Sequence, residues 1–156
     1  MSKPSTKFAH LTVACVALGL AHLAAAAEYR SAEQAAILYD GPSPRAAKVA
    51  IAPKGMPLEI VVNDANAPYL KVRERGGQML WIERKALSEK RFLVVSAPTA
   101  PVRATADEAA AVVFQAEQDV ALETLEAPVA AKVWVRVKHR DGLTGFVKIS
   151  QTWGWQ

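Results

Sequence analysis

The sequence predicts an all-β protein made of two related halves, and three observations lead to this expectation. Short apolar stretches of strand length alternate with turn sequences along the chain. These stretches are rich in β-branched and aromatic residues, which are common in strands. A hairpin pattern at 69–87 returns at 134–150 on nearly the same plan. We therefore expect one small β unit that occurs twice, because a single large core would not repeat its hairpin.

Candidate strands occur in both halves, separated by turn sequences such as "YDGPSP" and "RGGQ". Only 31–38 and 106–112 have a helical composition, and each is too short and too rich in alanine to be convincing as an isolated helix. The candidate strands are residues 48–52, 56–62, 69–75, 79–84 and 92–97 in the first half and 110–116, 119–126, 132–139 and 144–150 in the second half.

The two hairpins correspond residue by residue at a constant shift of 65. Matching positions hold aromatic, cationic, β-branched or glycine residues in both copies, which chance rarely produces. The matching pairs are Tyr69 with Trp134, Lys71 with Arg136, Val72 with Val137, Gly77 with Gly142, Trp81 with Phe146 and Ile82 with Val147. The earlier stretches "PLEIV" and "ALETL" match at a shift of 64, so one surface loop differs by a residue.

Each hairpin has a turn that contains glycine. Residues 76–77 (Gly-Gly) and 141–142 (Asp-Gly) predict a two-residue type I′ turn, in which both central residues have positive φ. In the second copy, Gly145 predicts a bulge or a bend inside the following strand. We expect the aromatic residue of that strand, Trp81 or Phe146, to lie in the small core of its own copy.

An aromatic-x-Lys/Arg-Val strand, a glycine turn and a second strand with an aromatic residue make up both hairpins. They read "YLKV" with "GQMLWI" and "WVRV" with "GLTGFV". This pattern resembles the signature of bacterial SH3-like (SH3b) domains, and "ILYDGPS" followed by "KVAIAPKGMPLEIV" is similar to the start of such a domain. The resemblance implies two tandem SH3-like β-barrels at 29–95 and 98–155, as in exported two-copy SH3 proteins of Gram-negative bacteria. Small barrels have many roles, so it implies little about function.

The two copies depart from the pattern in different ways. The first copy has Leu80 where the second has glycine before its aromatic residue. The second copy has Arg103 and Ala104 in place of the segment 38–43, so its first loop lacks both the aromatic residue and the proline. If the groove of such a domain needs an aromatic residue in that loop, the first copy is the binder and the second is its packing partner.

Residues 1–27 are predicted to be a secretory signal peptide. Two lysines precede a mainly apolar run, and small residues precede Glu28. Cleavage is expected after Ala27, which gives a periplasmic protein with no membrane span. Two alternatives stay open. One is an uncleaved anchor, although the run falls short of about 20 apolar residues. The other is a lipoprotein acylated at Cys15, although only "LTVA" would then form its apolar stretch.

Charge and residue content argue against several functions. The sequence has 19 Lys and Arg against 15 Asp and Glu. Two lysines fall in the signal peptide, so the remaining charge is about +2, and a nucleic-acid partner is not expected. Beyond residue 27 there is no cysteine and one histidine, His139. Neither a Cys nucleophile with its base nor a zinc ligand set is therefore available. We expect no enzymatic activity, no cofactor and no metal.

Alternation along the third strand of each copy predicts a surface strip. The strip residues are Tyr69, Lys71 and Arg73 in the first copy and Trp134, Arg136 and Lys138 in the second, with Leu70, Val72, Val135 and Val137 as inward neighbours. Two interpretations stay open. In the first, the rings pack on a peptide or sugar and the cations meet carboxylates. In the second, the rings close the end of the barrel beneath the cation stems.

The tail "QTWGWQ" places Trp153 and Trp155 on one side of an extended segment. They either dock across the seam between the copies or form an exposed contact for a partner. The expected function is that of a noncatalytic binding module of the periplasm and cell envelope. It would engage a peptidoglycan peptide or a peptide segment of an envelope protein. The alternative is a structural or regulatory subunit for protein interaction that does not bind the cell wall.

Overall fold

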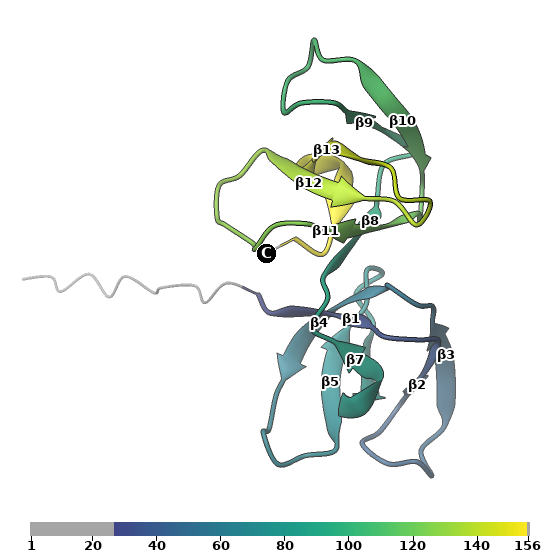
Figure 1. Cartoon of the computed structure of the whole chain (residues 1–156). Helices are drawn as coiled ribbons and strands as arrows, with labels where there is room; N and C mark the ends of the chain where they lie inside the picture. Colours follow the sequence, from purple (N-terminus) through teal and green to yellow (C-terminus); the bar gives the residue numbers. More distant parts are fainter. Residues whose placement is uncertain (1–26, 156) are drawn as a thin grey trace, which may run out of the picture.

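The computed structural model describes residues 27–155, which form two lobes joined by a short linker (Figure 1). Strands dominate this range, and its only helical segments are two 3-10 turns of three residues each. The predicted all-β class is therefore confirmed. No helix within these residues is long and apolar enough to cross a membrane. The predicted signal peptide up to residue 26, with Cys15, lies outside the described residues.

The first lobe, which we call the first unit, is one antiparallel sheet of seven strands. The strands are β1 (Tyr29–Ala32), β2 (Ala36–Tyr39), β3 (Lys48–Ala52), β4 (Pro57–Val62), β5 (Tyr69–Arg73), β6 (Met79–Glu83) and β7 (Leu87–Ser88), and the 3-10 turn η1 (Arg84–Ala86) precedes β7. Their order is β3-β2-β6-β5-β4-β1-β7, so the hairpin of β5 and β6 lies inside the sheet and β3 lies at an edge.

The second lobe, the second unit, repeats this topology. The strands are β8 (Phe92–Val95), β9 (Thr99–Arg103), β10 (Val112–Glu117), β11 (Ala121–Thr124), β12 (Trp134–Lys138), β13 (Thr144–Lys148) and β14 (Thr152–Trp153), and the 3-10 turn η2 (Ile149–Gln151) precedes β14. Their order is β10-β9-β13-β12-β11-β8-β14, which is the order of the first sheet with each strand replaced by its counterpart.

The structure differs from the sequence predictions at the strands that open each unit. Residues 31–38, with their helical composition, contribute to β1 and β2 instead. Residues 106–112 form a turn that leads into β10. β8 pairs with β11 and β14 of the second sheet, whereas the sequence division placed it in the first unit. The reason is burial, because Leu93 and Val95 of β8 enter the second core.

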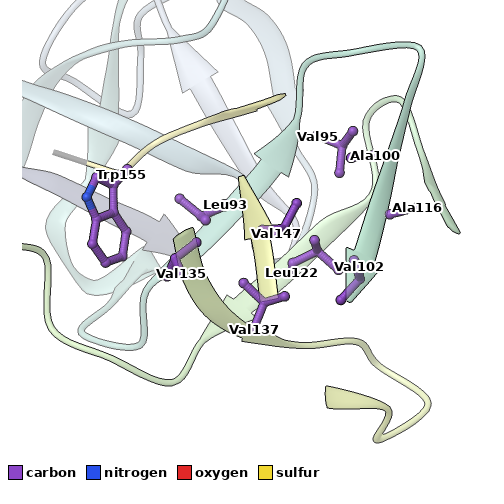
Figure 2. Close-up of a cluster of buried hydrophobic side chains, with 10 residues drawn as sticks. All are labelled: Leu93, Val95, Ala100, Val102, Ala116, Leu122, Val135, Val137, Val147 and Trp155. Carbon is purple, nitrogen blue, oxygen red and sulfur yellow. The ribbon is translucent and has the colours of Figure 1, made fainter. Parts of the chain in front are cut away.

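Each unit closes over its own hydrophobic core. The inward positions predicted for the third strands are confirmed, because Leu70, Val72, Val135 and Val137 are fully buried. The first core contains Ala32, Leu38, Ala52, Leu58, Leu70, Val72, Leu80 and Ile82. Figure 2 shows the second core, which contains Leu93, Val95, Ala100, Val102, Ala116, Leu122, Val135, Val137, Val147 and Trp155.

The predicted core positions of Trp81 and Phe146 are wrong. Alternation along β6 buries Leu80 and Ile82, so Trp81 between them lies half-buried on the outer face. The same alternation buries Val147 in β13 and leaves Phe146 half-buried outside. A strand can direct only every second side chain to the core, and the aliphatic residues occupy that set here.

The hairpin turns are longer than predicted. In the second unit the His139 and Leu143 backbones close a three-residue loop, with the His139 N–H donating to the Leu143 carbonyl at 2.8 Å. Only Gly142, with φ of 89°, has a positive φ in that loop. The first unit repeats this arrangement, and Gly77 has φ of 92°. A type I turn followed by one left-handed residue also fits the twist of a hairpin, so a type I′ turn is not required.

Gly145 explains a difference between the sheets. A Cβ atom at this position would lie 2.7 Å from the Arg103 carbonyl oxygen and 2.7 Å from Val102 Cγ1. Strand β9 therefore approaches β13 too closely for any side chain. The first unit accommodates Leu80 at the same position, where it is 3% exposed and belongs to the core. The two sheets thus share a topology and differ in how closely their strands approach at this crossing.

The units meet along a seam close to the linker, residues 89–91. Ser31 of β1 is fully buried there, and its hydroxyl accepts a hydrogen bond of 3.0 Å from the Phe92 N–H of β8. The Phe92 ring packs beside Gly55, where a Cβ atom would lie 3.2 Å from the ring. A buried polar contact must keep its partner, so this hydrogen bond fixes the register of one unit on the other.

The carboxyl-terminal tail also crosses the seam, and the end of the chain lies between the lobes in Figure 1. The Trp153 ring packs edge-on against Tyr29 of the first unit, with centroids 5.1 Å apart. Arg91 donates hydrogen bonds to the carbonyls of Gly154 and Trp155 at 2.9 and 3.0 Å. Burial lowers the pKa of Arg91, although a guanidinium stays protonated at neutral pH.

Candidate functional site

Three aromatic side chains gather on the outer side of the first unit. Tyr39 of β2 and Lys71 of β5 both lie opposite Trp81 of β6 in the strand register, so the three residues share a face of the sheet. Tyr69 lies two residues before Lys71 on that face, and its ring meets Tyr39 at nearly a right angle with centroids 5.9 Å apart. We call Tyr39, Tyr69 and Trp81 the aromatic face.

Charged groups of both signs surround the aromatic face. The Tyr69 hydroxyl donates to a Glu83 carboxylate oxygen at 3.4 Å, and Lys85 Nζ lies 2.7 Å from the other Glu83 oxygen. Burial and then the Glu83 carboxylate raise the pKa of Tyr69. The hydrogen bond to Glu83 likewise raises the pKa of Lys85. Lys71 Nζ lies 6.0 Å from the Trp81 ring centroid, at the limit for a cation–π contact.

Two hollows flank the aromatic face, and both reach Glu83. The larger one, of about 530 Å³, is lined by Pro44, Pro68 and Tyr69 together with charged residues of η1. The smaller one, of about 210 Å³, lies beside Tyr39. Rings and prolines supply an apolar floor, and Glu83 supplies a carboxylate between the hollows. This arrangement suits a peptide, which presents apolar groups, amides and charges within a short length.

The wall of the larger hollow is held by Arg84. Its Nε donates to the Ala67 carbonyl at 3.0 Å and its Nη1 to Asn63 Oδ1 at 3.0 Å, and it also bonds the Asp64 carbonyl. These bonds fix the loop between β4 and β5, which includes Pro68. Because the loop is already fixed, a ligand that binds here loses less free energy to ordering the loop.

The same positions carry different chemistry in the second unit. Phe146 of β13 lies opposite Arg103 of β9, so Arg103 takes the place of Tyr39. Trp134 takes the place of Tyr69, and Lys148 lies over its ring at 5.5 Å, where Glu83 lies in the first unit. This face is therefore cationic where the aromatic face has a tyrosine and a carboxylate.

The loop between β9 and β10 covers part of the second-unit face. Arg103 Nη1 donates to the Ala110 carbonyl at 2.7 Å, and Lys148 forms an ion pair with Glu108. Both partners belong to that loop. The corresponding loop of the first unit bonds to itself instead, since the Ala47 N–H donates to Asp40 at 2.9 Å. The second-unit side chains are thus engaged within the protein.

The predicted strips do not form one surface. Tyr69 is 6% exposed and Lys71 is half-buried, and both belong with the aromatic face. Arg73 is held by Glu59 of β4 at 2.6 Å. In the second unit, Trp134 lies beneath a lysine, Arg136 is exposed, and Lys138 borders a hollow at the seam. The outward direction predicted for the cations agrees with the strand register, and the rings are largely packed.

The two tail tryptophans are packed differently from each other. Trp153 docks across the seam on Tyr29. Trp155 is 6% exposed and enters the second core, where its indole N–H donates to the Val129 carbonyl at 3.3 Å. Figure 2 shows Trp155 at one end of that core, far from Ala116. Docking of the tail is therefore the arrangement observed, and the mostly buried Trp155 reaches the surface only at a hollow that Val129 and Lys132 also line.

The sequence pointed to the aromatic residue of segment 38–43, which is Tyr39, through the resemblance alone, did not indicate Glu83, and misplaced Trp81. Alternation within "MLWIE" was the available signal for Trp81, because it separates the tryptophan from Leu80 and Ile82. The position of Tyr39 beside Trp81 has no local signal, because it depends on the pairing of β2 with β6. Within residues 27–155, no group of three or more His, Cys, Asp or Glu residues could hold a metal ion.

Comparison with known proteins gives one family match. The model of the bacterial SH3 domain matches residues 96–154, which include all of the second unit after β8. No curated protein matches the chain. Among solved structures, NlpC2 from Trichomonas vaginalis is 13% identical with a TM-score of 0.37, over 81% of this chain and 47% of its own. NlpC1 from the same organism is 15% identical with a TM-score of 0.34, over 80% and 44%. The chain spans about half the length of these structures, and likeness this remote carries no argument about function.

Proposed function

Given a second unit that matches the bacterial SH3 domain, we propose that this protein is a noncatalytic binding module of the cell envelope. Its ligand is a peptide, and a cell-wall peptide fits best because it combines small apolar side chains with free carboxylates. The observation that supports this most is the aromatic face of Tyr39, Tyr69 and Trp81 beside two hollows.

The aromatic face offers a distinct contact for each part of such a peptide. The exposed Pro44 and Pro68 and the half-buried Trp81 ring pack against its apolar groups, and this burial supplies most of the affinity. Lys71 and Lys85 meet carboxylates, and Glu83 meets an amine or amide N–H. Tyr39 and Tyr69 are nearly buried, so they hold a surface that is formed before the ligand arrives.

Cosedimentation with purified peptidoglycan tests the proposal. We expect the wild-type protein to pellet with the cell wall at low salt. Trp81→Ala removes the most accessible ring of the aromatic face, which is half-buried, and should release the protein into the supernatant. Phe146→Ala removes the equivalent half-buried ring of the second unit and should leave pelleting unchanged. If wild type stays in the supernatant, or both variants lose binding equally, the proposal fails.

A second candidate is a structural or regulatory subunit that binds another envelope protein. The seam favours it, because a buried hydrogen bond at Ser31 and the Trp153 contact join the two units into one body. Such a body can present a large surface without using the aromatic face. A stable complex with an envelope protein that forms equally well with Trp81→Ala would support this candidate over the first.

Export to the periplasm is part of the proposal, and the sequence before Glu28 motivates it. Mass spectrometry of envelope extracts should find Glu28 as the new amino terminus. A mature mass that carries acyl chains on Cys15, or a chain that keeps residues 1–27, would contradict cleavage after Ala27.

A further inference from the structure

A groove runs along the seam between the two units, on residues that the aromatic face does not use. One hollow of about 580 Å³ is bordered by Lys54 of the first unit and by Lys138 and Arg140 of the second. A smaller hollow of about 160 Å³ adjoins it, because the two share Lys54, Phe92 and Glu123, and continues to Lys90. We call the two hollows together the seam groove.

The cations of the seam groove are available to a ligand. Lys54, Lys90 and Lys138 make no side-chain ion pair or hydrogen bond within residues 27–155, and Arg140 reaches only Asp141, at 3.8 Å. Both units contribute, since Lys54 follows β3 and Lys138 ends β12. Lysines in this position are normally solvated and contribute little to folding. Core packing therefore does not explain why four cations border one groove.

Acidic residues only partly balance these cations. Asp119 borders the groove, but Arg75 of the first unit holds it at 2.5 Å. Glu123 lies opposite Lys138 in the strand register and forms no ion pair within 4.0 Å among the described residues. Glu33 borders the smaller hollow. Four cations against two unpaired carboxylates leave a net positive groove with one negative group near its middle.

The Phe92 ring gives the groove an apolar centre. It lies between the two hollows and is held by its backbone hydrogen bond to Ser31 and by Gly55 beneath the ring. A ligand in the groove can therefore bury an apolar group at Phe92 and place anionic groups at either end. An extended peptide of the order acidic-x-apolar-x-acidic has this pattern, because side chains i, i+2 and i+4 of an extended chain lie on one face.

We infer that the seam groove is a second binding site, for an acidic peptide segment, and that it exists only when the two units are docked. Lys54 and Lys90 bind carboxylates on the side of the first unit, and Lys138 and Arg140 bind them on the other. Glu123 accepts from a peptide N–H between them. The site is separate from the aromatic face, so it goes beyond the proposed function and does not depend on it.

Calorimetric titration with the peptide acetyl-Glu-Ala-Leu-Ala-Glu-amide tests the inference, because its two Glu side chains and its Leu side chain lie on one face of the extended chain. We expect measurable binding at low salt that weakens as salt rises, because screening acts over about 10 Å at 0.1 M. The double variant Lys54→Gln with Lys138→Gln should lower the affinity about tenfold or more. The matched control, Lys48→Gln with Arg136→Gln, removes the same charge from exposed positions of β3 and β12 outside the groove. It should change the affinity less than twofold.

Further measurements distinguish the seam groove from nonspecific peptide binding and from the aromatic face. The uncharged peptide with Gln in place of each Glu should not bind, and Trp81→Ala should bind the acidic peptide as wild type does. Thermal melting checks that the variants fold, since surface substitutions rarely alter stability strongly. Equal weakening by the test and control variants overturns the inference. So does tighter binding of inorganic polyphosphate than of the peptide, because the groove would then be a general site for phosphate polymers.

Discussion

The outer face of the first unit and the equivalent face of the second are built on identical strand positions with opposite chemistry. Tyr39 and Glu83 in the first unit become Arg103 and Lys148 in the second. The strand order around them is the same. The two faces therefore differ in their side chains and not in their backbone topology. A few side chains on three neighbouring strands decide whether a face is covered.

The loops beside these faces explain why one face is partly covered and the other stays open. In the second unit, Arg103 and Lys148 bond to the loop between β9 and β10 through Ala110 and Glu108 and hold it against the face. In the first unit, the loop closes on itself through Asp40, and the hollow beside Pro44 stays open. A duplicated domain can in this way keep one copy for recognition and use the other to complete the seam.

Substitutions at the crossing of the sheet strands should have the largest effect on stability. Leu80→Ala removes a buried side chain from the first core and should lower the free energy of unfolding by about 2 to 5 kcal/mol. Gly145→Ala at the equivalent position should cost about 1 to 3 kcal/mol for the opposite reason, because its Cβ would overlap with β9. Urea unfolding measures both. A neutral Gly145→Ala would contradict the close approach of β9 and β13.

The seam should be the next most sensitive feature. Ser31→Ala leaves the Phe92 N–H without its buried acceptor and should lower the free energy of unfolding by about 1 to 3 kcal/mol. Ser43→Ala removes a hydroxyl that accepts an exposed N–H from Arg45 and serves as the control, with an expected change within about 0.5 kcal/mol. Equal melting temperatures for the two variants would indicate that the units do not depend on the Ser31 contact.

The two outer rings should contribute less to stability than core rings do. Trp81→Ala and Phe146→Ala each remove a half-buried ring, so each should cost about 1 to 2 kcal/mol, below the cost of a fully buried aromatic residue. Chemical denaturation measures the difference. If either variant lowers the free energy of unfolding as much as Leu80→Ala does, the ring belongs to the core and not to an outer face.

Ionisation of tyrosine should give the smallest effect, and it should come from the first unit. Burial and Glu83 raise the pKa of Tyr69 above its ordinary value of about 10. The stability from the neutral phenol is therefore fully present below about pH 10 and is lost as the pH rises through the folded-state pKa. Absorbance titration should show late ionisation that Tyr69→Phe diminishes. Tyr29 is the internal reference. Burial and the Glu59 carboxylate raise its pKa, and Tyr69→Phe leaves both in place.

Much of the fold could be predicted from the sequence, because period-two alternation and turn residues are local signals. They located β3 to β6 and β10 to β13, the repeat between the hairpins, and the inward Leu70 and Val72. Among the strands that open each unit, β8 was predicted at 92–97 but assigned to the first half, and β1 and β9 were missed. β2 is short and overlaps the segment 31–38, whose composition is helical, so its strand character comes from pairing with β3 and β6.

The candidate site was predicted less well, because it depends on contacts between strands distant in sequence. Tyr69 and Lys71 were found on one strand, but their partners Tyr39 and Glu83 come from two others. Trp81 was assigned to the core because a large ring in a small domain is usually buried. The aliphatic neighbours Leu80 and Ile82 already filled that core. The seam groove has no local signal, because its cations come from two units.

The central claim is that the first unit binds the ligand through its aromatic face and the second does not. Backbone amide NMR of the labelled protein, titrated with soluble peptidoglycan fragments, tests this most directly. We expect shifts at amides of β2, β5 and β6 around Tyr39, Tyr69 and Trp81, while β9, β13 and the start of β12 at Trp134 stay unchanged. Shifts that centre on Arg103, Trp134 and Phe146, or no shifts at all, would contradict it.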